Sequence, residues 1–479
     1  MSIRKNFGYN LILTLCNYLF PLITYPYVSR VLGADKIGVC GFVDGIVNYF
    51  VIFSMLGIGS YGVREIARCG SDLNRRSSVF TNLFIVNVLL TIISVAILVV
   101  ATLYFDRLQP YKPFLFIGVL KIVFNLFLIE WFFQGIERFK YITLRSVAVN
   151  TVYVVSVLLF VKNCNDVLLY YLLTTLVVVV NALCNWYCSR AFRQWNFKRL
   201  CITDCLLPIF TFGYYRVLTS MYTTFNVIFL GFVAGDTQAG YFTTATKLYT
   251  ILMAVFTAFT TVMIPRVSAM LHAGEHNKLQ RMANDTFDLL FLLSLPLIIF
   301  VLFFSPQIIS LLAGSGYEGA ILPFRIVILL LIVIGMEQIV VQQFLMASTS
   351  NRPIMIVSTV GAFTGIAVNL WLTPRYGAVG SALAWSFSEV AVLVAGLFMM
   401  KRYVSIDIEF GRIMNTLLYS LPYVLIDGII YFMTPSDIAM WVAVPLNVVL
   451  FILINIYIKR NEQLMIIAGS VISKFTLKR

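Results

Sequence analysis

Charged side chains are scarce in this sequence. Asp, Glu, Lys and Arg together make up 12% of the 479 residues, whereas 60% of the residues are hydrophobic and the mean hydropathy is +0.91. A water-soluble domain of this composition would have too little polar surface to cover its core. The sequence also has no long polar segment that could form a separate domain outside a membrane. We therefore expect an integral membrane protein.

Signatures of catalysis are also missing. The sequence has no P-loop, no Gly-x-Ser-x-Gly nucleophile motif and no Rossmann glycine pattern, so we expect neither ATP hydrolysis nor an enzyme. The only two histidines, His272 and His276, form a His-x-x-Glu-His pattern with Glu275. That pattern lies in a short polar segment without a third ligand, so zinc binding is not expected. No catalytic residue, metal or cofactor is predicted.

Long apolar runs are abundant instead. A helix needs about 20 residues to cross a hydrocarbon core of about 30 Å, and fourteen runs approach or exceed that length. They predict an all-α membrane protein. The predicted spans are 8–29, 38–62, 79–103, 113–134, 143–162, 167–188, 208–233, 239–264, 287–304, 321–346, 354–373, 378–400, 413–433 and 438–458.

An internal repeat organises these runs. Gly33, Gly38 and Arg64 recur 202 residues later as Gly235, Gly240 and Arg266, each time around an apolar hairpin. Internal repeats are common in transporters. We therefore expect an N-terminal lobe of six helices at 1–200 and a C-terminal lobe of six helices at 201–404. Two further helices and a tail follow at 405–479, and the tail has the pattern of an interfacial amphipathic helix.

The distribution of Lys and Arg predicts the orientation. Of the 35 basic residues, 25 fall on the side of the membrane that carries the N-terminus, six fall on the opposite side and four lie within predicted helices. Cytoplasmic loops are enriched in basic residues, so both termini are expected in the cytoplasm. The net charge of +14 is spread over short loops and does not form a nucleic-acid-binding domain.

Polar residues recur at helical spacing in the first hairpin of each lobe. Such polar stripes cannot face lipid. For the Ser and Thr residues taken by themselves, packing between helices is a sufficient explanation. The stripes contain Asn17 on the first span, Thr219, Thr223 and Asn226 on the seventh and Thr250 on the eighth.

Two cations within these stripes need a different explanation. Arg216 and Lys247 lie about 12 Å inside the predicted membrane, where a charge costs about 2.5–3.5 kcal/mol. They either extend to the membrane surface, pair with an acid, or face water. The preferred interpretation is a hydrated cationic cavity between the lobes that binds a phosphate-bearing substrate, with Arg30 at its outer end. Acidic residues within spans are Asp44, Glu337, Glu389 and Asp427. The first three are candidates for coupling to a proton or sodium gradient.

The chain resembles the Wzx-type O-antigen flippases, a polysaccharide-transporter branch of the multidrug/oligosaccharidyl-lipid/polysaccharide superfamily. The segments that carry the resemblance are Arg30-Val-Leu-Gly33, Trp131-Phe-Phe-Gln-Gly-Ile-Glu137 and Pro374-Arg-Tyr-Gly-Ala-Val-Gly380.

The resemblance implies a substrate, a direction and a location. The substrate would be an oligosaccharide on undecaprenyl diphosphate, moved from the cytoplasmic to the periplasmic leaflet of the bacterial inner membrane by alternating access. Membrane lipid and other polysaccharide-assembly proteins are the expected partners. Two alternatives stay open at this point: a multidrug exporter of the same superfamily, and a membrane-embedded polysaccharide polymerase or glycosyltransferase.

Overall fold

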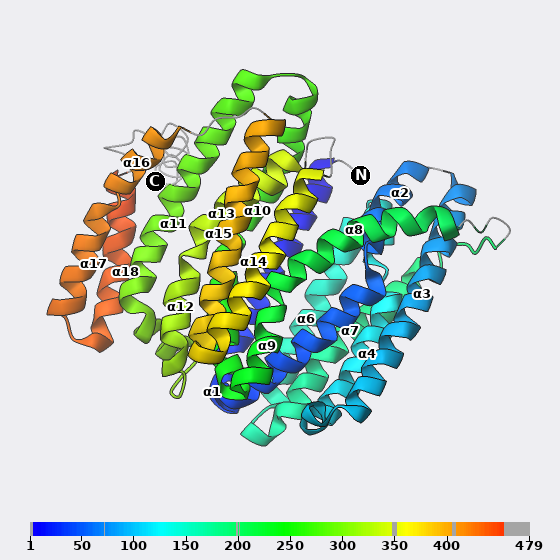
Figure 1. Ribbon diagram of the computed structural model, residues 1–479, viewed down its shortest axis with the longest axis horizontal. Helices are drawn as coiled ribbons and strands as arrows, with labels where there is room; N and C mark the ends of the chain where they lie inside the picture. The colour runs from blue at the N-terminus through cyan, green and yellow to red at the C-terminus, as the bar shows by residue number, and fades with distance from the viewer. Residues whose placement is uncertain are drawn as a thin grey trace, which may run out of the picture.

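The protein is a bundle of long helices in the computed structural model, which describes residues 3–70, 72–197, 200, 202–346, 352–404 and 409–454 (Figure 1). No strand occurs among these residues. The predicted tail helix lies outside them. The first half contains α1 (Ile3–Met55), α2 (Ile58–Cys69), α3 (Leu73–Tyr104), η1 (Asp106–Tyr111), α4 (Lys112–Leu128), α5 (Glu130–Gly135), α6 (Phe139–Phe160), η2 (Cys164–Asp166) and α7 (Val167–Ser189).

The second half begins with a bent pair of helices and ends with three helices on the flank of the bundle. Its elements are α8 (Ile202–Thr223), α9 (Phe225–Ala234), α10 (Asp236–His272), α11 (His276–Leu312), η3 (Glu318–Ala320), α12 (Ile321–Ile328), α13 (Leu330–Glu337), the π-helical η4 (Gln338–Leu345), α14 (Arg352–Tyr376), α15 (Ala378–Tyr403), α16 (Phe410–Leu418), α17 (Leu421–Met433) and α18 (Ser436–Leu453).

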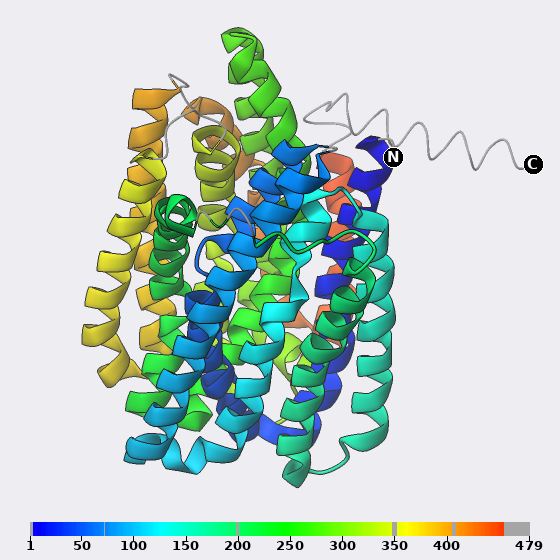
Figure 2. The ribbon, with the colours of Figure 1, turned by 90° about the vertical axis from the view of Figure 1, so that its right-hand side faces the viewer.

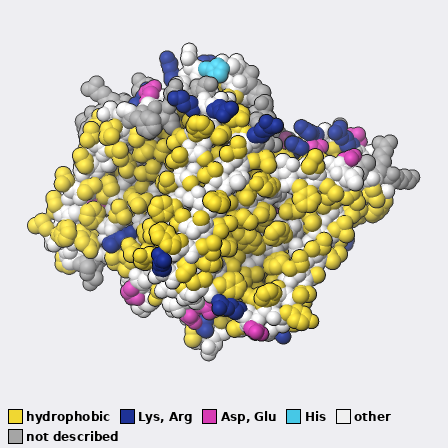
Figure 3. All heavy atoms as spheres, in the orientation of Figure 1, with side chains coloured by type: hydrophobic (Ala, Val, Ile, Leu, Met, Phe, Trp, Pro, Cys, Tyr) yellow, Lys and Arg dark blue, Asp and Glu magenta, His cyan; other side chains and the backbone are white. Residues whose placement is uncertain are grey.

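The helices confirm the predicted class. Among the described residues, nine helical segments are long and apolar enough to cross a membrane, or eleven when each of two bent pairs counts as one span. One of the nine, Ile12–Cys69, is kinked at Gly33 and covers most of the first predicted span and all of the second. The total of fourteen stays a prediction. A wide band of hydrophobic side chains covers the molecule, and Lys and Arg gather along its upper edge in the view of Figure 3.

Several predicted spans are not continuous helices. The predicted spans at 113–134, 208–233, 321–346 and 413–433 are each broken or bent along their length, because hydropathy reports apolarity and not backbone direction. Ile129, with φ 32°, separates α4 from α5. The pair α8 and α9 and the pair formed by α12 with α13 and η4 each bend by 40°. The run at 287–304 is only the middle of the 37-residue α11.

The two copies of the repeated turn adopt the same backbone conformation. Gly33 has φ 78° and ψ 168°, and Gly235 has φ 86° and ψ 177°. Glycine reaches this region without steric cost. Each turn is followed by a glycine that packs against the other copy. A Cβ on Gly38 would collide with the carbonyl oxygen of Asp236, and a Cβ on Gly240 with that of Ala34.

We call this contact between α1 and α10 the glycine junction. Thr237 of α10 donates to Asp35 of α1 at 3.2 Å, and Tyr111 on η1 joins the junction by donating to Asp236 of α10 at 2.7 Å. Thr237 and Asp35 are themselves 202 residues apart. The two repeat copies therefore pack against each other at one end of the bundle.

The remaining helices build around this pair. The rest of α1 packs against α3, α4 and α6, and α4 packs along α7. In the other half, α14 pairs with α15 and also supports α8. The last three helices, α16 to α18, pack against α11 at the flank of the bundle (Figure 1). The α10–α11 hairpin rises above the other helices in both ribbon views (Figure 2).

Candidate functional site

A cavity of about 380 Å³ lies where α1, α6, α7 and α10 meet. Its volume is within the range of small-molecule sites in proteins. The described residues that line it are aromatic, amide, hydroxyl and apolar side chains together with one cation: Asn17, Tyr18, Phe20, Pro21, Thr24, Tyr25, Asn150, Tyr153, Tyr170, Thr174, Lys247, Thr250 and Ile251.

Lys247 is the only charged side chain among these lining residues. Its Nζ lies 5.0 Å from the centroid of the Tyr25 ring, a cation–π distance. Tyr25 is itself held by a hydrogen bond of 2.6 Å that its hydroxyl donates to Thr244 on α10. The cation therefore faces a cavity whose described lining contains no carboxylate, which favours an anionic ligand over a cationic one.

Asn17 and Thr250 of the predicted stripes also line this cavity, but Arg216 does not. Arg216 lies on the exposed face of α8, which packs mainly against α14. No hydrogen bond or ion pair joins it to another described residue. In this conformation Arg216 and Lys247 do not line one shared cavity. Of the bent pair, α9 packs against α10, whereas α8, which carries Arg216, turns away by 40° and packs against α14.

Other residues of the seventh predicted span bond within the protein. The hydroxyls of Thr219 and Thr223 donate to carbonyl oxygens one turn earlier in α8, at 2.8 and 3.0 Å. Asn226 is fully buried, donates to Tyr222 O at 2.8 Å and accepts a hydrogen bond from Asn369 on α14. In this conformation the Asn226 amide is satisfied between helices and packs the bundle, and its predicted role as a substrate ligand stays a prediction.

Arg30 also has a different environment from the one predicted. Its guanidinium donates to the carbonyl oxygen of Leu311 at the end of α11, and its side chain packs on Gly314. Next to it, Ser29 donates to Leu312 O at 3.2 Å and accepts from the Tyr317 hydroxyl at 3.0 Å. Arg30 therefore ties α1 to α11 in this conformation.

The predicted acidic residues separate into two groups. Asp44 on α1 forms an ion pair of 2.5 Å with Lys121 on α4. It therefore compensates Lys121, and no ion pair joins it to Arg216 or Lys247. The sequence places Lys121 within a span but does not show which acid it meets, because the two residues are 77 positions apart.

Glu337 and Glu389 are brought together. Glu389 on α15 is 3% exposed and accepts a hydrogen bond of 2.7 Å from Trp385 Nε1. Glu337, at the end of α13, lies near it and is partly buried. Tyr249 of α10 packs its ring edge-on against Trp385, with the centroids 5.4 Å apart. Two carboxylates near each other inside an apolar bundle repel each other, and a bound cation or proton relieves that repulsion.

Sequence reasoning missed the aromatic lining of the cavity. Tyr25, Tyr153 and Tyr170 come from three helices, and Asn150 lies one turn from Tyr153. The chain has 25 tyrosines, so composition does not single these out. Among the described residues there is no cluster of three or more His, Cys, Asp and Glu side chains that could hold a metal ion.

Comparison with known proteins gives the family. The family model described as "Polysaccharide biosynthesis protein" matches residues 3–271, and the "MatE" model matches residues 215–371. A protein of Escherichia coli (strain K12) named "Putative O-antigen transporter" is 23% identical over 410 residues, which cover 84% of this chain and 96% of that protein.

Solved structures share the fold. The lipid II flippase MurJ in its inward closed conformation aligns with a TM-score of 0.76 at 13% identity, covering 92% of this chain and 97% of that chain. An inward-facing multidrug resistance MATE family transporter of the MOP superfamily aligns with a TM-score of 0.62 at 16% identity, covering 81% and 94%. The resemblance to polysaccharide flippases of this superfamily is confirmed, and with it the prediction of a membrane transporter and not an enzyme. The match over residues 3–271 shows that this chain belongs to the polysaccharide biosynthesis protein family.

Proposed function

We propose that this protein flips an oligosaccharide linked to undecaprenyl diphosphate from the cytoplasmic to the periplasmic leaflet of a bacterial inner membrane. The E. coli relative named as an O-antigen transporter and the fold shared with the lipid II flippase support the general activity. The concentration of Lys and Arg on the side that carries the N-terminus supports a cytoplasmic location for both termini.

The observation that carries the proposal is the cavity around Lys247. A diphosphate entering the apolar core without replacement donors would lose its hydration at prohibitive cost. Lys247 supplies a mobile positive charge, and Asn17, Asn150 and the tyrosine hydroxyls can supply neutral hydrogen bonds. In this proposal Lys247 takes the phosphate, the aromatic and amide groups take the first sugars, and the lipid tail stays in the bilayer.

Alternating access requires one end of the path to close. The glycine junction supports a conformation that is closed at the end of the bundle where Gly33 and Gly235 turn. The link from Arg30 to Leu311 lies beside the same turn, one helical turn before Gly33 in α1. Opening toward the periplasm would separate α1 from α10 at the junction and release Arg30, which would then be free to meet the departing head group.

We further propose that a proton or sodium gradient drives the cycle through Glu337 and Glu389. Structurally related MATE proteins are transporters of the same superfamily. A pair of neighbouring carboxyl groups inside the bundle is suited to hold one proton or one sodium ion. Asp44 is less suited, because Lys121 already neutralises it.

A multidrug exporter is the alternative, since the MATE model matches residues 215–371. Cationic drugs would need acidic groups in their binding cavity. The described lining around Lys247 carries a cation and no carboxylate, which argues against this alternative. The polymerase or glycosyltransferase alternative has no support from the relatives.

Flipping of a labelled lipid-linked oligosaccharide in reconstituted vesicles without nucleotide tests the proposal. We expect Lys247→Ala to reduce the rate at least tenfold and Lys247→Arg to retain part of it, since Arg also binds phosphate. Lys140→Ala is the matched control, because Lys140 is exposed on α6 outside the cavity. Arg216→Ala should have a smaller effect than Lys247→Ala. A wild-type rate for Lys247→Ala at normal protein levels would refute the assignment of the cavity.

A further inference from the structure

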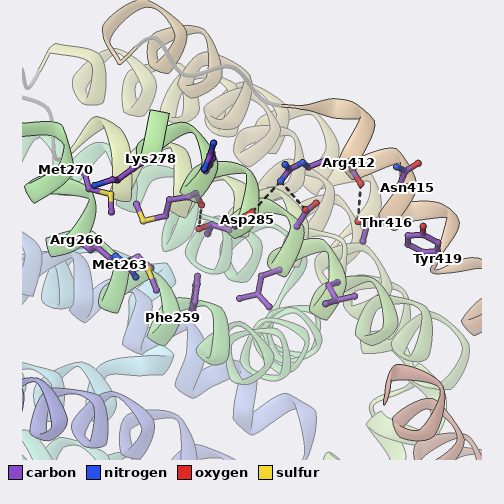
Figure 4. A pocket seen from close by; sticks show the side chains of 16 residues that line it. Phe259, Met263, Arg266, Met270, Lys278, Asp285, Arg412, Asn415, Thr416 and Tyr419 are labelled. Carbon is purple, nitrogen blue, oxygen red and sulfur yellow. Dashed lines mark hydrogen bonds and ion pairs between the residues drawn. The ribbon is translucent and has the colours of Figure 1, made fainter. Parts of the chain in front are cut away.

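A second, larger pocket of about 760 Å³ lies between α10, α11 and α16. It is distinct from the cavity around Lys247, because no residue lines both. Arg266, Met263 and Phe259 form one side, and Arg412, Asn415 and Thr416 of α16 form the other (Figure 4). It opens beside the α10–α11 hairpin, at the end of the bundle where basic side chains gather (Figure 3).

The cations of this pocket are not equivalent. Arg412 is neutralised, since its guanidinium lies 2.8 Å from Glu409, 3.3 Å from Asp285 and 3.9 Å from Asp288. Lys278 forms an ion pair of 2.9 Å with Glu275.

Arg266 and Arg281 remain. They lie on opposite arms of the α10–α11 hairpin, and neither has an ion pair or hydrogen bond with another described residue. The lining contains four cations and two carboxylates, and both carboxylates pair with Arg412, so Arg266 and Arg281 are left without an ion-pair partner among the described residues. Two arginines that share a concave site favour a phosphate group, which each can hold through parallel N–H bonds.

Part of the pocket lining is apolar and consists of Phe259, Met263, Leu289 and Leu292. A soluble phosphate would contact only the charged side chains. A lipid would bring its head group to the charged side chains and the start of its acyl chain to the apolar ones.

We propose that this pocket binds the phosphate head group of an anionic membrane lipid, held between Arg266 and Arg281. Basic pockets between membrane helices at a charged membrane surface bind anionic lipid head groups. The bound lipid would join the α10–α11 hairpin to α16 and so connect the repeat to the added C-terminal helices. This inference does not depend on the proposed transport function.

Native mass spectrometry of the purified full-length protein with phosphatidylglycerol or phosphatidylcholine tests the proposal. We expect the wild-type protein to bind phosphatidylglycerol more tightly than phosphatidylcholine. Replacing both arginines, Arg266→Gln with Arg281→Gln, should weaken phosphatidylglycerol binding about thirtyfold, because each basic residue near a membrane surface contributes slightly more than about fivefold. Phosphatidylcholine binding should not change.

The matched control removes two other basic residues of the same membrane end, Arg75→Gln with Arg402→Gln, both exposed and outside the pocket. An equal loss in this control would show a general surface-charge effect and overturn the proposal. Wild-type affinity for phosphatidylglycerol in the Arg266→Gln, Arg281→Gln variant, with an unchanged melting temperature, would also overturn the proposal. Inorganic pyrophosphate is added as a competitor, and displacement of phosphatidylglycerol at sub-millimolar pyrophosphate would overturn the lipid as the source of the phosphate. The conservative pair Arg266→Lys and Arg281→Lys should retain most of the binding.

Discussion

The two sides of α10 carry opposite chemistry. On the side that faces α1, α6 and α7, Lys247 lines a cavity without a carboxylate in its described lining. On the side that faces α13 and α15, Tyr249 packs against Trp385, which bonds to Glu389 beside Glu337. Lys247 and Tyr249 are two positions apart, so they point to nearly opposite faces of one helix.

This difference suggests how one helix can serve two ligands. The face of α10 that lines the cavity around Lys247 can accept a large anion. The face that packs against Trp385 has room only for a proton or a small cation. A movement of α10 that follows ligand binding on one side must change the packing on the other. We therefore expect α10 to couple the two sites, and the following predictions address each side and the junction where α10 meets α1.

The largest effect is expected from Glu389→Gln. This change keeps the shape of the side chain but removes its ability to bind a cation, so the part of transport that depends on a proton or sodium gradient should disappear. Transport in vesicles with and without an imposed gradient measures this. Asp427→Asn is the matched control. Asp427 is a buried acid in α17, at the flank of the bundle, and accepts a hydrogen bond of 2.8 Å from Asn447. A full response to the gradient in Glu389→Gln would show that this carboxylate does not couple transport to the gradient.

A smaller effect is expected from Gly240→Ala at the glycine junction. The added methyl group would collide with the carbonyl oxygen of Ala34, and overpacking of this kind costs about 1–3 kcal/mol. The closed arrangement of α1 and α10 should become correspondingly less populated. The reactivity of a cysteine at Ala34, in a chain without other cysteines, toward a water-soluble thiol reagent should rise about tenfold or more.

Gly59→Ala is the control for that experiment, because a Cβ at Gly59 would meet only the end of the Met55 side chain at 4.0 Å. Unchanged thiol reactivity in Gly240→Ala would mean that the junction tolerates the methyl group and does not hold the two helices closed.

The smallest effect is a pH dependence at the same junction. Burial raises the pKa of Asp236 above its usual value of 3.8, although the hydrogen bond from Tyr111 acts in the opposite direction. A group whose pKa is higher in the folded protein stabilises the fold when it is protonated, and this contribution is lost as the pH rises through the raised pKa. Relative to Asp236→Asn, the wild-type melting temperature should therefore fall as the pH increases from about 4.

Asp166 provides a control of opposite sign. Two backbone N–H groups, of Lys162 and Asn163, donate to its carboxylate at 2.8 Å and lower its pKa. Relative to Asp166→Asn, the wild-type melting temperature should rise as the pH increases through the usual carboxyl range. Differences of the same sign for Asp236 and Asp166 would contradict the assignment of Asp236.

Much of the architecture was predictable because it depends on composition and local sequence. Apolar runs predicted the helices, and the recurrence of Gly33 and Gly38 as Gly235 and Gly240 predicted a repeat whose two turns have the same backbone conformation. The clustering of basic residues at one end was also visible in the order of the chain. Lys247 could be recognised as a candidate, because a lysine deep within an apolar run requires water or a partner wherever it lies.

The pairings between distant helices depended on the tertiary structure. Asp44 with Lys121 and Glu337 with Glu389 come from helices whose relative rotation no local pattern specifies. The 40° bend after α8 moved Arg216 away from Lys247, although both arms of that hairpin had been recognised. The hydrogen bond between Asn226 and Asn369 likewise joins two helices, α9 and α14, whose relative placement no local pattern specifies. The sequence determined which residues must avoid lipid, and the packing of helices decided whether each one faces a partner, a cavity or the protein surface.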